Sequence, residues 1–139
     1  MIKKVLAAFD GSESTDRVLG WAVDMAGLWN AELHGVYVIE TGWSEGDVPR
    51  ELIIRALEES SESLTAEVQR KVSELEGSIT VHQRRGHPGD EIIQCAEEIG
   101  ADLIVIGSTG KSRIKSILLG SVSSFVVMHS PVATLVVKP

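Results

Sequence analysis

The spacing of hydrophobic and polar positions changes regularly along the chain, and these changes predict strands and helices in alternation. Residues 4–9 and 102–106 are apolar runs without polar alternation, as is typical of strands covered on both faces. Between the apolar runs, hydrophobic residues recur at the spacing of one helix face. The pattern predicts strands at 4–9, 32–39, 78–84, 102–106 and 133–137, and helices from 14 to Asn30, at 50–75, at 88–99 and at 122–128.

Short connections join the predicted elements throughout residues 1–139, so we expect a single domain. Strands and helices that alternate in this way predict a parallel sheet with helices on both faces. Ligands of such sheets bind beyond the carboxyl ends of the strands, where the strand order reverses. The polar turn at 10–14 and the loop that begins at Gly107 both follow predicted strands. We therefore expect these two loops to lie together at one edge of the sheet.

The longest predicted helix, at 50–75, has an apolar stripe and a charged face. The charged face is typical of a helix surface in contact with solvent. The stripe consists of Ile53, Leu57, Leu64, Val68, Val72 and Leu75.

Acidic residues outnumber basic ones, and the formal net charge is −7. A broad nucleic-acid-binding face is therefore not expected, because such faces carry clustered Lys and Arg. No apolar run approaches the roughly 20 residues of a membrane span, and the first residues lack the apolar region of a signal peptide. The single cysteine, Cys95, cannot form an internal disulfide, which favours a cytoplasmic location.

The loop after the strand at 102–106 contains Gly-Lys-Ser at 110–112, which invites comparison with phosphate-binding motifs. A P-loop needs a glycine where this chain has Val105, so that motif is excluded. The dinucleotide motif is excluded too, because the first strand is followed by Asp-Gly-Ser at 10–12. The loop could still present backbone N–H groups to an anion from two directions. The pattern that fits is Gly-x2-Gly-x9-Gly-Ser, carried by Gly107, Gly110, Gly120 and Ser121.

This glycine motif lies in an alternating α/β chain with Asp10 after the first strand and Pro131 before a valine-rich terminal strand. The combination resembles the ATP-binding branch of the universal stress protein family, and the resemblance covers the whole chain as one domain. It implies a three-layer α/β/α fold with a five-stranded parallel sheet in the order 3-2-1-4-5, as in the adenine nucleotide alpha hydrolases. It also implies ATP held over the carboxyl edge of that sheet.

The resemblance implies a role for each part of the site. Asp10 would meet the ribose or adenine end of the nucleotide, and the backbone of Val38 would meet the adenine edge. Segments 107–110 and 120–123 would wrap the phosphates. Mg²⁺ or Mn²⁺ would arrive with the nucleotide, held by phosphate oxygens rather than by the protein, and no residue is assigned a catalytic role. The full set implied for ATP binding is Ala8, Asp10, Ser12, Val38, Gly107, Ser108, Gly110, Lys111, Gly120, Ser121, Val122 and Ser123.

Several notable residues also have an ordinary structural interpretation. Asp10 could be only a turn residue, and Lys111 could contact a terminal phosphate or extend into solvent. His87 is expected to initiate a helix near the site, and Cys95 is expected to pack in the core. Trp43 could cover the adenine side of the site or be exposed.

The sequence therefore predicts an ATP-binding universal stress protein that acts as a nucleotide-dependent switch or sensor in the stress response. Any hydrolysis would be slow or partner-dependent, because the sequence places no general base or water-positioning residue. The alternatives are a nucleotide-free dimerisation module of the same fold, a slow ATPase, and a nucleotidyl- or acyl-activating enzyme. The sequence of the first turn disfavours the last of these.

The terminal strand, from Thr134 to Val137, is apolar and would form an edge of the sheet in the implied strand order. An exposed apolar edge favours pairing with another chain, and members of the family often dimerise through these last strands. We therefore expect a homodimer. The alternative is a monomer whose edge is shielded by Lys138 and Pro139.

Overall fold

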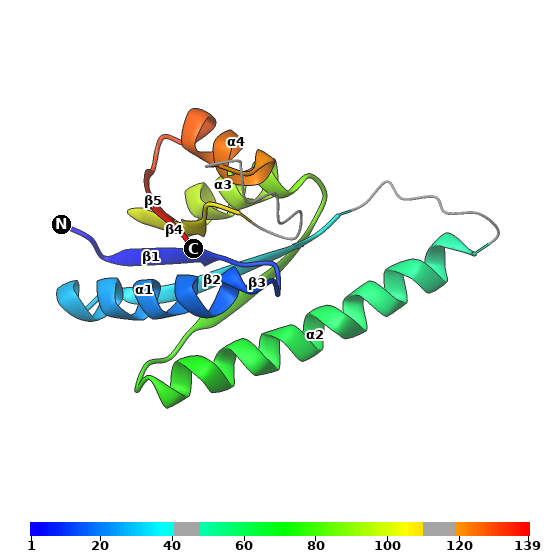
Figure 1. The fold of residues 1–139 in the computed structure, drawn as a ribbon, viewed down its shortest axis with the longest axis horizontal. Helices are drawn as coiled ribbons and strands as arrows, with labels where there is room; N and C mark the ends of the chain where they lie inside the picture. The colour runs from blue at the N-terminus through cyan, green and yellow to red at the C-terminus, as the bar shows by residue number, and fades with distance from the viewer. Residues whose placement is uncertain (41–47, 110–118) are drawn as a thin grey trace.

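The described residues form a parallel sheet between two layers of helices, as the computed structural model in Figure 1 shows. The structure describes residues 1–40, 48–109 and 119–139. Its strands are β1 (Lys4–Ala8), β2 (Glu32–Ile39), β3 (Thr80–Arg85), β4 (Leu103–Gly107) and β5 (Ala133–Val137). Its helices are α1 (Ser14–Trp29), α2 (Arg50–Glu74), α3 (Pro88–Ile99) and α4 (Ser121–His129). Each predicted element is present, with ends that differ from the prediction by at most two residues.

The strand order is β3-β2-β1-β4-β5, and all neighbouring strands are parallel, so the predicted fold is confirmed. β1 lies at the centre of the sheet. Its Val5 pairs with Leu33 of β2 on one side and with Leu103 of β4 on the other. Because β1 and β4 are covered by helices on both faces, their side chains need no polar alternation. This explains the two unbroken apolar runs of the sequence.

Alternate residues of each strand supply two separate cores. Val5, Ala7 and Val105 face α1 and α2, whereas Leu6 and Ile104 face α3 and α4. Figure 1 shows these helix pairs on opposite sides of the sheet. The second core includes Cys95, which is fully buried, and burial raises the pKa of its thiol. The predicted packing role of Cys95 is confirmed.

Three helix ends follow local sequence signals. α1 ends at Asn30, which has a φ of 50°, and α3 ends at Gly100, which has a φ of 71°. Both residues occupy the left-handed conformation that commonly terminates helices. α3 begins after His87, whose Nδ1 accepts a hydrogen bond from the backbone N–H of Asp90 at 3.3 Å. The predicted helix-initiating role of His87 is confirmed.

The apolar stripe of α2 packs on the sheet only in part. Val68 and Val72 are buried in the core, whereas Leu75, the last member of the stripe, is 50% exposed. Leu75 is the residue that follows the last turn of α2. Figure 1 shows the amino-terminal half of α2 extending beyond the sheet. Ile53 and Leu57 in that half are partly buried and line a cavity, and Leu57 also packs against the core.

The length and hydropathy of the described helices bear on whether any of them could span a membrane. None of those in residues 1–40, 48–109 and 119–139 is both long and apolar enough to cross a bilayer.

Ser61 is a polar residue at the contact between α2 and the rest of the protein. It is fully buried, and its hydroxyl has no hydrogen-bond partner within the part of the chain that the structure describes. A buried hydroxyl without a partner loses its hydrogen bonds to water and gains none in return. Ser61→Ala is therefore expected to raise the free energy of unfolding by about 1 kcal/mol, measured by urea denaturation.

Thr65→Val provides the contrast one turn further along α2. The Thr65 hydroxyl donates to the Ser61 carbonyl at 3.0 Å and accepts from the Gln83 side chain at 3.1 Å. We expect this variant to lower the free energy of unfolding, because two hydrogen bonds are lost. A destabilised Ser61→Ala protein would mean that the Ser61 hydroxyl is satisfied.

Candidate functional site

A cavity of about 770 Å³ lies at the carboxyl edge of the sheet. It is bounded by the carboxyl ends of β1, β2 and β4 and by residues in the amino-terminal halves of α1, α2, α3 and α4. Its walls are mostly apolar, with polar groups from the turn after β1 and from the start of α4. The residues that line it are Ala8, Phe9, Asp10, Ser14, Tyr37, Val38, Ile39, Glu40, Val48, Ile53, Leu57, Pro88, Ile92, Ile106, Gly107, Thr109, Gly120, Ser121, Val122 and Ser123.

Most of the residues predicted for ATP binding meet at this cavity. Those that line it are Ala8, Asp10, Val38, Gly107, Gly120, Ser121, Val122 and Ser123. Ser12 and Ser108 do not line it. Gly110 and Lys111 lie outside the described residues, as does Trp43.

The turn after β1 is stabilised by its own polar groups. Asp10 Oδ1 accepts a hydrogen bond from the backbone N–H of Ser12 at 2.9 Å, and Gly11 follows Asp10 with a φ of 81°. The Gly11 N–H is bonded to Thr15 Oγ1 at 3.1 Å. Asp10 is thus a turn residue, as one interpretation predicted, and it also lines the cavity. The Ser12 hydroxyl lies 2.9 Å from the Ser14 hydroxyl. Ser14 lines the cavity, whereas Ser12 lies behind it and does not.

Ser108 has a structural role in place of direct contact with the cavity. Its side chain is buried, and its N–H donates to the Val137 carbonyl at 2.8 Å. Its carbonyl accepts from the Gly120 N–H at 2.6 Å, and the Ser123 hydroxyl lies 3.0 Å from the same oxygen. These bonds fix the start of α4 against the end of β4. The hydroxyl of Ser123 is therefore engaged within the protein, whereas Ser121 is exposed at the cavity.

The backbone of Val38 points toward the open space beyond β1. The carbonyl of Val36 accepts from the Phe9 N–H at 3.2 Å, so it faces β1, and the carbonyl of Ile39 accepts from the Gly86 N–H at 3.0 Å, so it faces β3. Backbone groups of alternate strand residues point the same way. Val38 therefore directs its N–H and C=O toward the β1 side, where β1 has already ended at Ala8.

Several residues of the cavity wall were not among those predicted from the sequence. Ile53 and Leu57 project from one face of α2, four positions apart, and Tyr37 and Thr109 also border the cavity. The spacing of Ile53 and Leu57 was visible in the sequence, where it indicated only one apolar face of a helix. Ser14 was recognised only as the end of the polar turn after the first strand and was given no role in the site.

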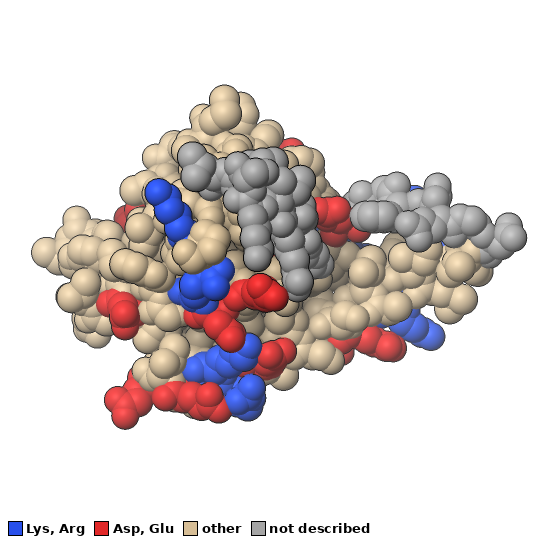
Figure 2. Space-filling model, in the orientation of Figure 1, with Lys and Arg blue, Asp and Glu red and all other residues tan. Residues whose placement is uncertain are grey.

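Acidic and basic side chains of the described residues are interspersed on the face drawn in Figure 2. Acidic partners also surround Lys71 of α2, whose ammonium lies 2.5 Å from the Asp16 carboxylate of α1 and 3.0 Å from Glu67. The hydrogen bonds to Asp16 and then to Glu67 raise the pKa of Lys71. Basic groups of this kind are neutralised within the protein. The expectation that the chain does not bind nucleic acid remains a prediction.

Among residues 1–40, 48–109 and 119–139, no group of three or more His, Cys, Asp or Glu residues is placed to hold a metal ion. The prediction that a cation would arrive with a nucleotide stays a prediction.

Comparison with known proteins identifies the family. The model of the "Universal stress protein family" matches residues 1–138. The chain belongs to this family. Universal stress protein MJ0531 of Methanocaldococcus jannaschii is 33% identical over 141 residues, a match that covers 99% of this chain and 83% of that protein.

Solved structures of universal stress proteins share the fold. The structure of MJ0577, also from Methanocaldococcus jannaschii, superposes with a TM-score of 0.86 at 29% identity and covers 100% of this chain and 97% of that one. A universal stress protein in complex with cAMP superposes with a TM-score of 0.66 at 28% identity and covers 99% of this chain and 97% of that one. An adenine nucleotide is therefore a ligand of at least one similar protein.

The close approach of Ser14 to Gly107 generates a test of how the cavity is built. A Cβ atom at Gly107 would lie 3.0 Å from Ser14 Oγ and 3.3 Å from the Thr109 carbonyl oxygen. Gly107→Ala is therefore expected to lower the free energy of unfolding by about 1–3 kcal/mol through overpacking. In a Ser14→Gly background the added loss should be smaller, because the nearest neighbour is gone.

Gly20→Ala is the matched control for that measurement. A Cβ at Gly20 would meet nothing within 4 Å, and the residue lies inside α1. The substitution should stabilise the protein by up to about 1 kcal/mol, because alanine favours the helix. Equal effects of Gly107→Ala with and without Ser14 would show that the two residues are not coupled.

Proposed function

We propose that this universal stress protein binds ATP in the cavity at the carboxyl edge and acts as a nucleotide-dependent switch or sensor in the stress response. The observation that carries the proposal is the meeting, in one cavity, of a strand backbone, a carboxylate turn and a helix amino terminus. These three features match the three parts of an adenine nucleotide.

The adenine base would occupy the end of the cavity beside Val38. The backbone there offers one donor and one acceptor, and the adenine edge carries an amino donor beside ring-nitrogen acceptors. Ile53 and Leu57 of α2 supply apolar surface on the same cavity, against which the faces of a base can pack. Asp10, at the end of β1, would accept hydrogen bonds from the ribose hydroxyls.

The phosphates would occupy the end of the cavity beside α4. The first turn of an α-helix has backbone N–H groups without intrahelical partners, and its dipole favours negative charge. Gly120 precedes α4, and Ser121, Val122 and Ser123 form its first turn and border the cavity. Gly110 of the glycine motif and the adjacent Lys111 would provide the remaining contacts to the phosphates. Mg²⁺ or Mn²⁺ would be held chiefly by the phosphate oxygens.

Two further parts of the proposal concern assembly and location. β5 is an edge strand of the sheet, and the apolar segment from Thr134 to Val137 would pair with the same segment of a second copy to form a homodimer. The protein would act in the cytoplasm. Hydrolysis of ATP is not required for a switch, since bound and free states can differ in the partner that they favour.

Gly120→Val tests the phosphate end of the site. Gly120 has a φ of −72°, which valine adopts readily, but a Cβ there would lie 3.3 Å from the Ser108 carbonyl oxygen and 3.8 Å from Ser123 Oγ. We expect a folded dimer with affinity for ATP reduced at least about 100-fold, or roughly 2.8 kcal/mol. Calorimetry with ATP and Mg²⁺ measures the affinity, and circular dichroism and light scattering check the fold and the dimer.

The wild-type protein provides the reference. Protein purified without added nucleotide would be denatured, and the supernatant chromatographed for ATP, ADP and AMP. No released nucleotide, together with no binding of ATP up to millimolar concentration with Mg²⁺, would overturn the proposed function. Normal binding by Gly120→Val would instead mean that the phosphates lie elsewhere.

Leu57→Ala tests the base end of the site. The Leu57 side chain borders the cavity, so its loss should weaken ATP binding about fivefold, as expected for roughly 1 kcal/mol of apolar contact. Leu52→Ala is the control, because Leu52 lies on the same helix, is 56% exposed and does not line the cavity. The same calorimetric titration would give both values. An equal loss in the two variants would argue against a base beside Leu57.

A further inference from the structure

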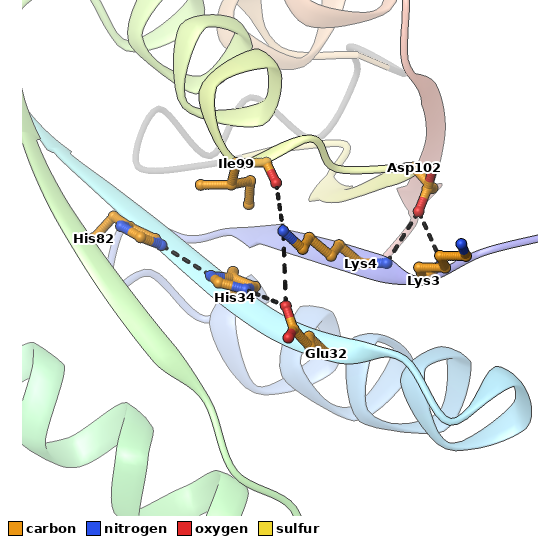
Figure 3. A network of polar contacts seen from close by, with 7 residues as sticks. All are labelled: Lys3, Lys4, Glu32, His34, His82, Ile99 and Asp102. Atoms are coloured by element: carbon orange, nitrogen blue, oxygen red, sulfur yellow. Dashed lines mark hydrogen bonds and ion pairs between the residues drawn. The ribbon is translucent and has the colours of Figure 1, made fainter.

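The amino-terminal half of the sheet carries a row of hydrogen-bonded side chains that has no part in the cavity. Figure 3 shows Glu32 and His34 of β2 in line with His82 of β3. His34 Nδ1 lies 2.9 Å from His82 Nε2, and His34 Nε2 lies 3.3 Å from Glu32 Oε2. The two imidazole planes are inclined by only 12°, and their centroids are 5.2 Å apart.

The distance between the two histidines limits how many protons they can hold. A nitrogen–nitrogen distance of 2.9 Å requires one ring to donate an N–H and the other to accept it with a lone pair. A single added proton is compatible with this bond, because His34 can donate from Nε2 to Glu32 and from Nδ1 to His82. With two added protons both facing nitrogens carry hydrogen, so the bond is lost and two like charges face each other.

The surroundings of the pair also oppose the second proton. Burial lowers the pKa of His82, and the charges of His34 and then Arg84 lower it further, while Glu98 of α3 acts in the opposite direction. Arg84 lies between Glu91 and Glu98 of α3, in ion pairs with both.

Lys4 of β1 faces the other end of the row. Its ammonium donates to the Ile99 carbonyl at 2.9 Å and lies 3.9 Å from Glu32 Oε2 (Figure 3). The Glu32 carboxylate is thus shared between Lys4 and His34.

We propose that His34 and His82 form an acid-sensitive latch between β2 and β3. β3 lies at the edge of the sheet, with β2 as its neighbour. The residues that the latch joins are 48 positions apart in the sequence. Double protonation opens the latch and weakens the attachment of the edge strand, so mild acid destabilises the protein through this pair.

The direction of the pH dependence follows from the lowered pKa of His82. The unfolded chain binds a proton at the ordinary value of 6.5, whereas the folded chain resists it until a lower pH. The contribution of His82 to stability is therefore complete above pH 6.5 and decreases as the pH falls below it. The latch is closed near neutral pH and opens in acid.

Thermal unfolding at pH 7.5 and pH 5.0 tests the latch in the full chain. His82→Gln keeps a polar side chain that can hydrogen-bond but cannot take up a proton in this range. We expect the loss of Tm between the two pH values to be roughly 3 °C larger in the wild type than in His82→Gln. His129→Gln, which removes an exposed histidine at the end of α4, should keep the wild-type loss.

An NMR titration of the histidine ring protons makes the test independent of how well a variant folds. The His82 ring of the wild type should take up its proton at a pH below 6.5, and His34→Asn should move this titration upward. Equal Tm losses in wild type and His82→Gln, or a His82 titration at its ordinary pH that ignores His34→Asn, would overturn the latch. ATP binding at neutral pH does not enter either measurement.

Discussion

The central position of β1 is the constraint on which the rest of this structure depends. Parallel strands cannot be joined by tight turns, so each connection crosses the sheet through a helix. From β1 the chain moves outward through α1 to β2, and after β3 it returns through α3 on the opposite face to pair β4 with the other side of β1. The segments that follow β1 and β4 therefore lead to helices on opposite faces of the sheet. The cavity occupies the space between them.

Small residues and backbone groups shape that carboxyl edge. Gly107 has no side chain where Ser14 approaches, and the carbonyl of Ser108 receives the N–H of Gly120. The result is a helix amino terminus held at a fixed place beside the end of a strand. Backbone groups of this kind are suited to a ligand, because their positions are set by the sheet and not by flexible side chains.

The opposite edge of the sheet is organised by charged and titratable side chains. Asp102 Oδ2 accepts the backbone N–H groups of Lys3 and Lys4 at 2.8 and 3.1 Å, and these bonds lower the pKa of Asp102. The same region contains the Glu32–His34–His82 row (Figure 3). One edge of the sheet thus holds the cavity, while the other joins strands through hydrogen-bonded charged and titratable side chains.

The amino-acid sequence by itself determined which segments are strands and helices and where several of them end. Asn30 and Gly100 end helices through their own backbone conformation, so local signals reveal them. The apolar runs of β1 and β4 are recognisable because strands covered on both faces need no polar alternation. The glycine spacing that ends at Gly120 and Ser121 indicated the family, and with it the strand order and most of the predicted site. Only the tertiary structure showed that Ser108 holds the start of α4 against the end of β4. It also showed that Ile53 and Leu57 of α2 line the cavity and that His34 is hydrogen-bonded to His82. These outcomes depend on which strands pair and where a helix crosses the sheet, and periodicity within one element carries no information about either.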